Sequence, residues 1–238
     1  MKQQELTEVG VEVLLNKPAT ELLNDFGAGR ASPGSGSAAA LLGILSAKML
    51  CTVCDISSGK DECLSFRKDF AYISEQVRGN YEIRLRELFE KDARDFDQVV
   101  ALRVNRDSAT DTNEKAKFSR DSLDLLQTAT DYTFEIAEIS LKLMEFGVSI
   151  FDNGWHAVRG DSGVAISGAM SSVMSSIFII NLNLKTLKRR KYAKDNLKRC
   201  QKIQSQLEIL QTKAFSCVTS ISSESVKSIQ LDMISPTD

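Results

Sequence analysis

The stretch that decides the fold is Ser37-Ala-Ala-Ala-Leu-Leu-Gly-Ile-Leu-Ser-Ala-Lys-Met-Leu-Cys-Thr-Val-Cys-Asp-Ile56. Between Leu41 and Val53 its one charged residue is Lys48, and apolar side chains occur on nearly every side of a helix built from it. A helix that is apolar all round belongs in the interior of a protein. The sequence therefore predicts a helix over 37–56 in the middle of a helical bundle.

The rest of the chain is also suited to long helices, because residues 35–233 contain no proline, the strongest helix breaker. The one strand-like pattern is a weak alternation from Val9 to Val13. Periodicity predicts further helices over 19–26, 61–104 (with Gly79-Asn80 as a candidate break), 114–151, 162–184, and a last amphipathic helix that buries Ile203, Leu207, Leu210 and Phe215.

These elements predict an all-α fold, an up-and-down antiparallel helical bundle. We expect a single domain over 1–238, in which 1–17 is an N-terminal extension and 191–238 a C-terminal helix and tail.

The composition is ordinary for a globular protein, and the N-terminus and the cysteines favour the cytoplasm as its location. The 238 residues are 42% hydrophobic and 26% charged, and 30 basic against 32 acidic residues give a net charge of −2. No overall field therefore attracts nucleic acid or an acidic membrane. Residues 1–10 lack the basic start and apolar stretch that export requires, and the odd number of cysteines, five, argues against a disulfide framework.

A membrane span is the alternative for the stretch from Ser162 to Leu184, which has no charged residue and is long enough to cross a bilayer. Six serines and two asparagines dilute its hydrophobicity below that of typical spans. We therefore expect a buried helix of a soluble bundle, and no membrane as a partner.

Asp92 is the residue that points most directly to chemistry. It belongs to a helix face with spacings of 4, 3, 4 and 3, made of Leu85, Phe89, Asp92, Phe96 and Val99. Burial disfavours an ionised carboxylate, and nearby Asp95 adds like charge, so we expect a raised pKa suited to general acid or base work. The alternative is an ion pair with a basic residue of a neighbouring helix.

Asp161 precedes the uncharged helix and has two interpretations that do not exclude each other. Aspartate is a preferred N-cap, which is a structural role. The functional interpretation is a carboxylate at a helix mouth that meets the substrate.

The Gly/Ser-rich loop from Ser32 to Ser37 exposes backbone N–H groups just before a helix N-terminus, where the helix dipole favours an anion or a polar ring edge. No Gly-Lys-Ser/Thr follows it and no strand precedes it, so it is neither a phosphate-binding P-loop nor a dinucleotide fingerprint. The structural alternative is a tight turn between helices.

Metal binding is not expected. Cys51 and Cys54 form a C-x-x-C inside an apolar helix without a second pair, which favours buried structural thiols. The single histidine, His156, excludes sites that need several, although one acid-base role stays open.

A basic segment from Lys185 to Lys202 has nine Lys or Arg residues against the single acid Asp195. It is suited to a polyanion, or it is a solvated helix end whose cations favour the preceding helix dipole. Nucleic acid is not expected, because Tyr192 is the one aromatic residue among the charges.

Several motifs in order resemble the cyclodeaminase/cyclohydrolase family of folate enzymes, over roughly residues 18–190. The family's Pro-Thr-Pro-Gly-Gly-Gly-Ser loop corresponds to Ser32-Pro-Gly-Ser-Gly-Ser37, and its Gly-Lys to Gly59-Lys60. Its Asp-Ala-x-x-Phe appears as Asp92-Ala-Arg-Asp-Phe96, its Ser-Asp-x-x-Val-Ala as Gly160-Asp-Ser-Gly-Val-Ala165, and its Ile-Asn-Leu as Leu182-Asn-Leu184. The chain departs from the pattern at Ser35, at Gly160 and at Trp155, where an asparagine is usual.

The resemblance implies a homodimeric enzyme with its site near the subunit interface, no bound cofactor and a tetrahydrofolate derivative as substrate. It implies Asp92 and Asp161 as catalytic residues, and a substrate site made of Pro33, Gly34, Ser35, Gly36, Ser37, Lys60, Asn183, Lys185 and Arg189. Two reactions fit, hydrolysis of 5,10-methenyltetrahydrofolate to 10-formyltetrahydrofolate and deamination of 5-formiminotetrahydrofolate. The competing class is a helical ligand-binding protein that kept the bundle and lost the activity.

Overall fold

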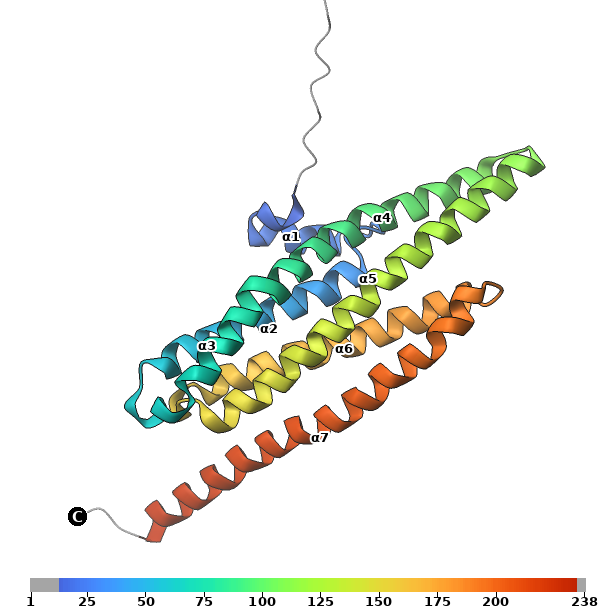
Figure 1. The fold of residues 1–238 in the computed structure, drawn as a ribbon. Helices are drawn as coiled ribbons and strands as arrows, with labels where there is room; N and C mark the ends of the chain where they lie inside the picture. Colours follow the sequence, from blue (N-terminus) through green and yellow to red (C-terminus); the bar gives the residue numbers. More distant parts are fainter. Residues whose placement is uncertain (1–12, 235–238) are drawn as a thin grey trace, which may run out of the picture.

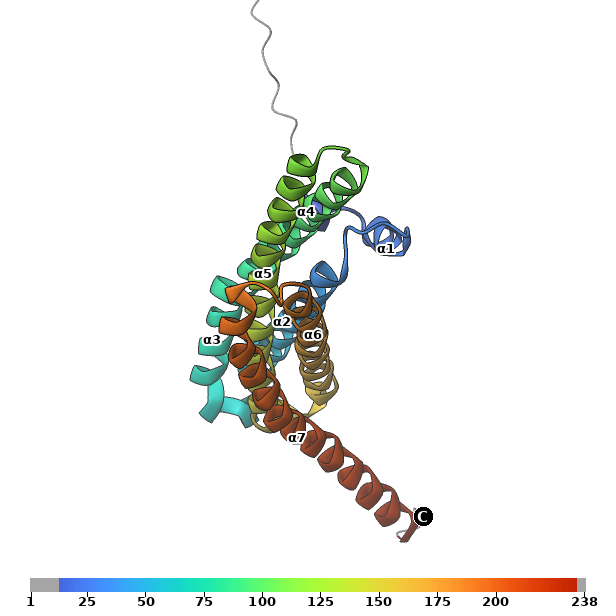
Figure 2. The ribbon, with the colours of Figure 1, turned by 90° about the vertical axis from the view of Figure 1, so that its right-hand side faces the viewer.

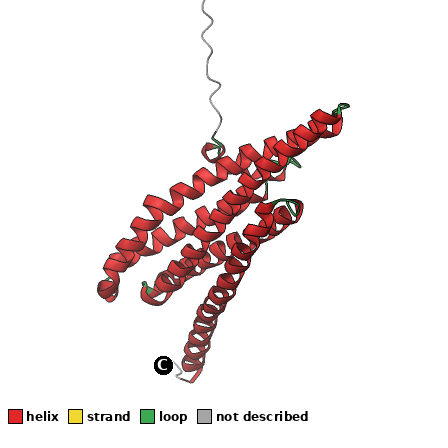
Figure 3. Cartoon of the chain, turned by 45° about the vertical axis from the view of Figure 1, so that its right-hand side comes forward, coloured by secondary structure: helices red, strands yellow, loops and turns green. Residues whose placement is uncertain are grey.

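The computed structural model describes the chain from Val13 to Ile234, and all regular structure in this range is helical (Figures 1 and 3). The α-helices are α1 (Ala19–Gly27), α2 (Ser35–Ser58), α3 (Arg67–Gln76), α4 (Glu82–Ser108), α5 (Thr112–Asn153), α6 (Arg159–Thr186) and α7 (Lys191–Ile234). Three 3-10 turns (Leu14–Asn16, Asp61–Phe66 and His156–Val158) and a π-helical turn (Val77–Tyr81) complete them. The predicted all-α up-and-down bundle is confirmed. The weak alternation at Val9–Val13 falls almost entirely outside the described residues, as does most of the 1–17 extension.

Helix α2 packs against α3, α4, α5 and α6, as its apolar sequence predicts. Ala39, Ala47, Leu50 and Val53 have no exposed surface. One side of the helix nevertheless faces outward, and Leu45 on that side is 53% exposed. The prediction of an interior helix therefore holds for every side of α2 except this one.

Serine side chains set the register between α2, α5 and α6. Ser46 Oγ donates a hydrogen bond to the Ala165 carbonyl oxygen, and Ser172 Oγ donates to that of Ala39, each at 2.7 Å. Ser172 Oγ also lies 2.8 Å from Ser140 Oγ. These contacts make α2 and α6 antiparallel, and they give the serines of the uncharged stretch partners in the core.

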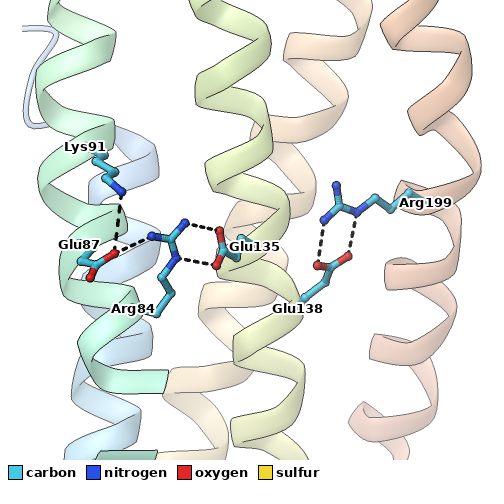
Figure 4. Close-up of polar contacts among 6 residues, drawn as sticks. All are labelled: Arg84, Glu87, Lys91, Glu135, Glu138 and Arg199. Atoms are coloured by element: carbon cyan, nitrogen blue, oxygen red, sulfur yellow. Dashed lines mark hydrogen bonds and ion pairs between the residues drawn. The ribbon is translucent and has the colours of Figure 1, made fainter. Parts of the chain in front are cut away.

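Bidentate ion pairs join the helices on the outer side of the bundle (Figure 4). Arg84 of α4 donates to Glu135 of α5 at 2.6 and 2.8 Å. Arg199 of α7 donates to Glu138 of α5 through two bonds of 2.8 Å. Because Glu135 and Glu138 are three residues apart, one face of α5 connects to helices on either side of it.

The break predicted at Gly79-Asn80 is a π-helical turn over Val77–Tyr81, and the chain runs through it from α3 into α4. Helices α4 and α5 then form a long hairpin, whose far end extends past the rest of the bundle (Figure 1). At that end Asp111 caps α5 by accepting a hydrogen bond from the Glu114 N–H at 2.9 Å.

Helix α7 lies antiparallel to α6 along the outside of the bundle and projects beyond it at its C-terminal end (Figure 2). Ile203, Leu207 and Leu210 are buried as predicted. The prediction for Phe215 is wrong, since its side chain is 58% exposed and Ala214 is buried instead. Phe215 is five residues after Leu210, and this step turns it off the helix face that repeats every three or four residues.

Two helices are long and apolar enough to cross a membrane by length and composition alone, Ser35–Ser58 and His156–Thr186. Of the most apolar 18-residue stretch in each helix, 61% is buried inside the bundle in the first helix and 39% in the second. Helix α6 is thus buried along one side only, which differs from the expectation of a buried helix. Its exposed side is uncharged from Val164 to Leu182.

Candidate functional site

The carboxylate of Asp92 lies at the N-terminus of α2. Its Oδ2 accepts a hydrogen bond of 2.9 Å from Ser37 Oγ, and the carboxylate also accepts one from the Ser37 backbone N–H. Ser37 is in the first turn of α2, where N–H groups have no partner within the helix. The N-cap residue is Gly34, which has no side chain to fill that role. Asp92 on α4 therefore caps α2 across the helix interface.

The loop and α4 are in direct contact at this point. A β-carbon built on Gly36 would lie 2.2 Å from Oδ1 of Asp92 and 2.5 Å from its Cγ. Ser32 Oγ donates a hydrogen bond of 2.6 Å to the carbonyl oxygen of Ala93. The structure thus brings together Asp92 and the loop residues that the sequence singles out, namely Pro33, Gly34, Ser35, Gly36 and Ser37.

Burial raises the pKa of Asp92 from 3.8 to about 6. The hydrogen bonds from Ser37 favour the ionised form and oppose the shift, while the nearby charge of Asp95 adds to it slightly. The predicted rise is therefore confirmed, and desolvation is its main cause. No ion pair reaches Asp92 among residues 13–231, so the salt-bridge alternative is replaced by the helix cap.

Asp95 has partners of its own. Arg94 Nε donates to its Oδ1 at 2.9 Å and the Tyr132 hydroxyl donates to its Oδ2 at 2.8 Å. Burial, together with this hydrogen bond, raises the pKa of Tyr132 to about 12. Two neighbouring carboxylates of α4 are thus in different environments, since Asp92 has only hydroxyl and amide donors, whereas Asp95 also has a guanidinium.

A cleft of about 430 Å³ opens beside the loop. Ser32 and Pro33 form part of its wall together with Glu90, Ala93, Arg94 and Asp97 of α4, and the N-terminal segment closes it with Val13, Leu14, Lys17, Asp25 and Arg30. The cleft combines charges of both signs, and Arg30 and Asp25 form an ion pair at 2.5 Å. Neither arginine was predicted, because Arg30 lies outside every motif and Arg94 occupies one of the variable positions of the Asp-Ala-x-x-Phe motif.

Asp161 lies toward the opposite end of α2. Helix α6 begins at Arg159 with Val158 as its N-cap, so the interpretation of Asp161 as an N-cap is wrong and the residue belongs to the first turn. It precedes Ala165, which contacts Ser46, by one helical turn. At 1.5 Å per residue, this register separates Asp161 from Asp92 by about 20 Å along the bundle axis.

Lys60 lies at the same far end as Asp161. Its Nζ is 3.8 Å from the centroid of the Trp155 ring, a cation–π contact, and the backbone N–H of Trp155 donates to Ser57 Oγ at 2.9 Å. Ser57 is about 30 Å along α2 from Ser37. Trp155, the family departure, therefore contacts Lys60 and does not cover Asp92.

Asn183, Lys185 and Arg189 lie at the C-terminal end of α6 and in the turn after it. Because α6 runs antiparallel to α2, this end is on the side of the Ser32–Ser37 loop and away from Lys60. Lys185 and Arg189 are exposed. Two other members of the basic segment form ion pairs with α5, Arg190 with Asp124 and Arg199 with Glu138.

The cysteines have buried, unpaired thiols. Burial raises the pKa of Cys54 to about 12, which keeps this thiol protonated and unreactive at neutral pH. Across the described part of the chain, no group of three or more His, Cys, Asp or Glu side chains is placed to hold a metal ion. His156 contacts Arg159 at 3.0 Å, near the start of α6.

Residues 18–202 match the sequence pattern of formiminotransferase-cyclodeaminase. The chain belongs to this family. A relative named methenyltetrahydrofolate cyclohydrolase, from Methylorubrum extorquens, is 24% identical over 208 residues, which cover 86% of this chain and 97% of the relative. The formiminotetrahydrofolate cyclodeaminase of Thermotoga maritima has a similar fold, with a TM-score of 0.75 and 14% identity over 88% of this chain and 99% of that one.

Family membership supports folate one-carbon chemistry of the cyclohydrolase or cyclodeaminase type. Asp92, Gly36 and Ser37, on which the resemblance partly rests, form a single buried cluster, whereas Ser35 of the same loop is exposed. Lys60 and Asp161 lie at the other end of the same subunit. The contact in which Asp92 caps α2 through Ser37 was not predicted from the sequence. The one hint in the sequence is that glycines stand at positions 34 and 36, so the start of the helix has no side chain of its own to cap it.

Proposed function

We propose that the protein hydrolyses 5,10-methenyltetrahydrofolate to 10-formyltetrahydrofolate. The observation that carries the proposal is Asp92, a buried carboxylate with a pKa of about 6 beside the Gly/Ser loop. A general base is most effective when its pKa lies near the working pH. The relative from Methylorubrum extorquens, matched over nearly its whole length, is named for this reaction.

The proposed reaction begins with water adding to the amidinium carbon that joins N5 and N10. Asp92 takes one proton from this water as the C–O bond forms. The adduct then opens by breaking the bond between carbon and N5, and Asp92 returns its proton to N5. The second proton of the water leaves to solvent as the formyl C=O forms on N10, which balances the reaction.

Substrate access in this proposal is through the cleft beside the loop. Asp92 is 5% exposed, while its neighbours Pro33 and Ala93 line the cleft wall. The loop leads directly into the N-terminus of α2, where the helix dipole favours polar ring edges and anions. Lys185 and Arg189, exposed on the same side of the bundle, are suited to the glutamate tail of the folate.

A homodimer is part of the proposal, because α6 has an uncharged exposed face. Val164, Ser171, Met174, Phe178 and Leu182 follow a helical spacing along it, and Phe178 and Leu182 are 68% and 65% exposed. A contiguous apolar face of this kind marks an interaction surface. We call these five residues the α6 face.

A twofold dimer through the α6 face joins the two ends of the site. The Ser46–Ala165 and Ala39–Ser172 contacts put Asp92 level with about residue 174 of α6, so a twofold axis that crosses α6 near Ser167 lies midway between this level and Asp161. Lys60 and Asp161 of the second copy then lie at the level of Asp92 and the loop of the first. Asp92 and Asp161, which are far apart within one subunit, would then lie close together across the interface between two subunits.

The test is the loss of methenyltetrahydrofolate absorbance in the presence of the purified protein. Turnover that depends on Asp92 supports the proposal, whereas a rate equal to buffer from a folded dimer contradicts it. The second candidate, deamination of 5-formiminotetrahydrofolate, is favoured by the structural similarity to the Thermotoga maritima enzyme. Release of ammonia from that substrate, without hydrolysis of the methenyl compound, would decide for it.

A further inference from the structure

The C-terminal end of α7 extends past the helix against which it packs. Arg159, the first residue of α6, donates to Glu224 of α7 at 2.9 Å. Because the two helices are antiparallel, residues 225–234 lie beyond the start of α6, over a length of about 15 Å. Every residue of 218–231 is exposed. We call residues 215–234 the α7 arm, and in Figure 2 its end leans toward the side of the bundle on which α6 lies.

The arm carries an exposed apolar stripe. Its positions follow steps of 3, 4, 4 and 3 and therefore share one helix face. They are Phe215, Val218, Ser222, Val226 and Ile229. The four apolar side chains are 51–64% exposed. The stripe begins one residue, about 100° round the helix, after the buried Ala214, so it lies beside the face that α7 packs on its own bundle.

The sequence of the arm does not favour a helix that stands alone in water. Residues 218–229 read Val-Thr-Ser-Ile-Ser-Ser-Glu-Ser-Val-Lys-Ser-Ile, and apart from the glutamate and the lysine they are all serine or β-branched. These residue types have low helix propensity. Short helices obtain most of their stability from packing an apolar face. The helical arm therefore requires a surface on which its stripe can pack.

The twofold dimer proposed above places the end of a second α6 beside the arm. Its axis crosses α6 near Ser167, so residue 175 of the second copy is level with Arg159 of the first, since each is eight residues from the axis. Glu224 shares this level through its ion pair with Arg159. Because α7 is antiparallel to its own α6, the arm runs parallel to the second α6.

Phe178 of the second copy lies on the path of the arm. Val226 and Ile229 are two and five residues past Glu224, so they are level with about residues 177 and 180 of the second α6, on either side of Phe178. This ring is 68% exposed in one subunit and lies about 16 Å from the axis along α6. Helices that cross at an angle separate away from the crossing point, so the second α6 alone leaves Phe178 uncovered.

We propose that the α7 arm of each subunit packs along the end of α6 in a second copy of the chain, with Val226 and Ile229 against Phe178. The inference rests on the dimer of the proposed function. Charge favours the same partner, because residues 228–238 contain two acids and no base, whereas residues 176–190 contain five bases and no acid. The arm lies outside residues 18–202, which match the family pattern.

The test is disulfide formation in the full-length variant Phe178→Cys/Ile229→Cys. Within one chain these positions are about 36 Å apart along the bundle, so a bond between them must join two chains. We expect a covalent dimer on oxidation. Phe178→Cys/Lys227→Cys is the matched control, because Lys227 is about 200° round the arm from Ile229 and should cross-link at least about tenfold more slowly. Sedimentation of both reduced variants gives the fraction of dimer.

A charge on the stripe provides a second measurement. Ile229→Glu should raise the Kd of the dimer by about tenfold or more, because it buries an unpaired carboxylate, whereas Lys227→Glu should not raise it. Equal cross-linking of the two cysteine pairs, or none from a dimeric protein, overturns the arm and leaves the α6 dimer. A chain that is monomeric at every accessible concentration overturns both. A cross-linked dimer without folate turnover contradicts the proposed reaction and supports the arm.

Discussion

The carboxylate of Asp92 occupies the space that a side chain at position 36 would need. A β-carbon on Gly36 would lie 2.2, 2.5 and 2.6 Å from Oδ1, Cγ and Oδ2 of Asp92. The two hydrogen bonds from Ser37 hold the carboxylate in this position. The glycine in the loop and the acid in the buried helix face are therefore two parts of one contact between α2 and α4.

Gly36→Ala is expected to destabilise the protein by about 1–3 kcal/mol, because the added methyl group forces Asp92 away from Ser37. The destabilisation is a net value, since alanine itself favours the helix by up to about 1 kcal/mol. Urea unfolding followed by circular dichroism measures it. Gly27→Ala is the matched control, because a β-carbon there meets no atom within 4 Å. Equal stability of the two variants would show that Asp92 moves aside without cost.

Asp92→Asn is expected to reduce kcat/KM for methenyltetrahydrofolate by about 10²- to 10⁴-fold, the range for loss of a general base. Asparagine can still accept a hydrogen bond from Ser37, so the fold should persist. In the native protein, kcat/KM should fall about tenfold per pH unit below about pH 6, because the base becomes protonated. The exposed substitution Asp69→Asn in α3 is the control. Retention of full activity by Asp92→Asn would leave Asp92 with only its capping role.

Asp92 also predicts how stability depends on pH. Below about pH 3.8 its carboxyl group is protonated in both the folded and the unfolded chain, so burial carries no ionisation penalty. Between that value and about pH 6, the unfolded chain releases its proton while the folded protein keeps it, and stability falls as pH rises. The difference of about two pH units corresponds to about 3 kcal/mol.

Asp92→Asn removes this titration. Relative to the native protein, the variant should therefore gain about 3 kcal/mol between about pH 3.5 and pH 7. Urea titrations at both pH values provide the comparison, because the other carboxyl groups are common to the two proteins. Parallel stability profiles would mean that Asp92 has an ordinary pKa in the folded state.

The helical spacing of residues 85–99 was enough to predict much of this site. The spacing places an acid on a face that is otherwise apolar, so burial and a raised pKa follow without a structure. The hydrogen-bond partner of Asp92 could not be predicted from the sequence. Ser37 is 55 residues from Asp92, and the choice between a cap and an ion pair depends on which helix end meets α4.

Local sequence patterns gave wrong predictions where packing between helices decides where a helix begins or which side chain it buries. Asp161 has the sequence of an N-cap, yet the helix begins at Arg159, because the preceding 3-10 turn leads directly into it. The bulk of Phe215 favours burial, but its position on α7 turns it outward. The distance between Asp92 and Asp161 within one subunit depends on the antiparallel register of α2 and α6. The order of the motifs along the chain does not determine this register.

The proposed assembly of the site between two copies gives the last prediction. If Asp92 of one chain works with Asp161 of the other, Asp92→Asn and Asp161→Asn homodimers should both be inactive. A mixed dimer has one site with both native carboxylates and one with neither. Random mixing makes half of the dimers mixed, so about a quarter of the native activity should return.

The measurement requires the two inactive variants to be co-expressed and the mixed dimer to be counted by native mass spectrometry. Phe178→Glu places a charge in the α6 face and should both prevent dimerisation and abolish the recovery, whereas the exposed substitution Ser149→Glu in α5 should do neither. Mixed dimers that form without any recovery of activity would rule out a site shared between Asp92 and Asp161. Because each chain alone places these carboxylates about 20 Å apart along the bundle, recovery would be difficult to explain without contact between copies.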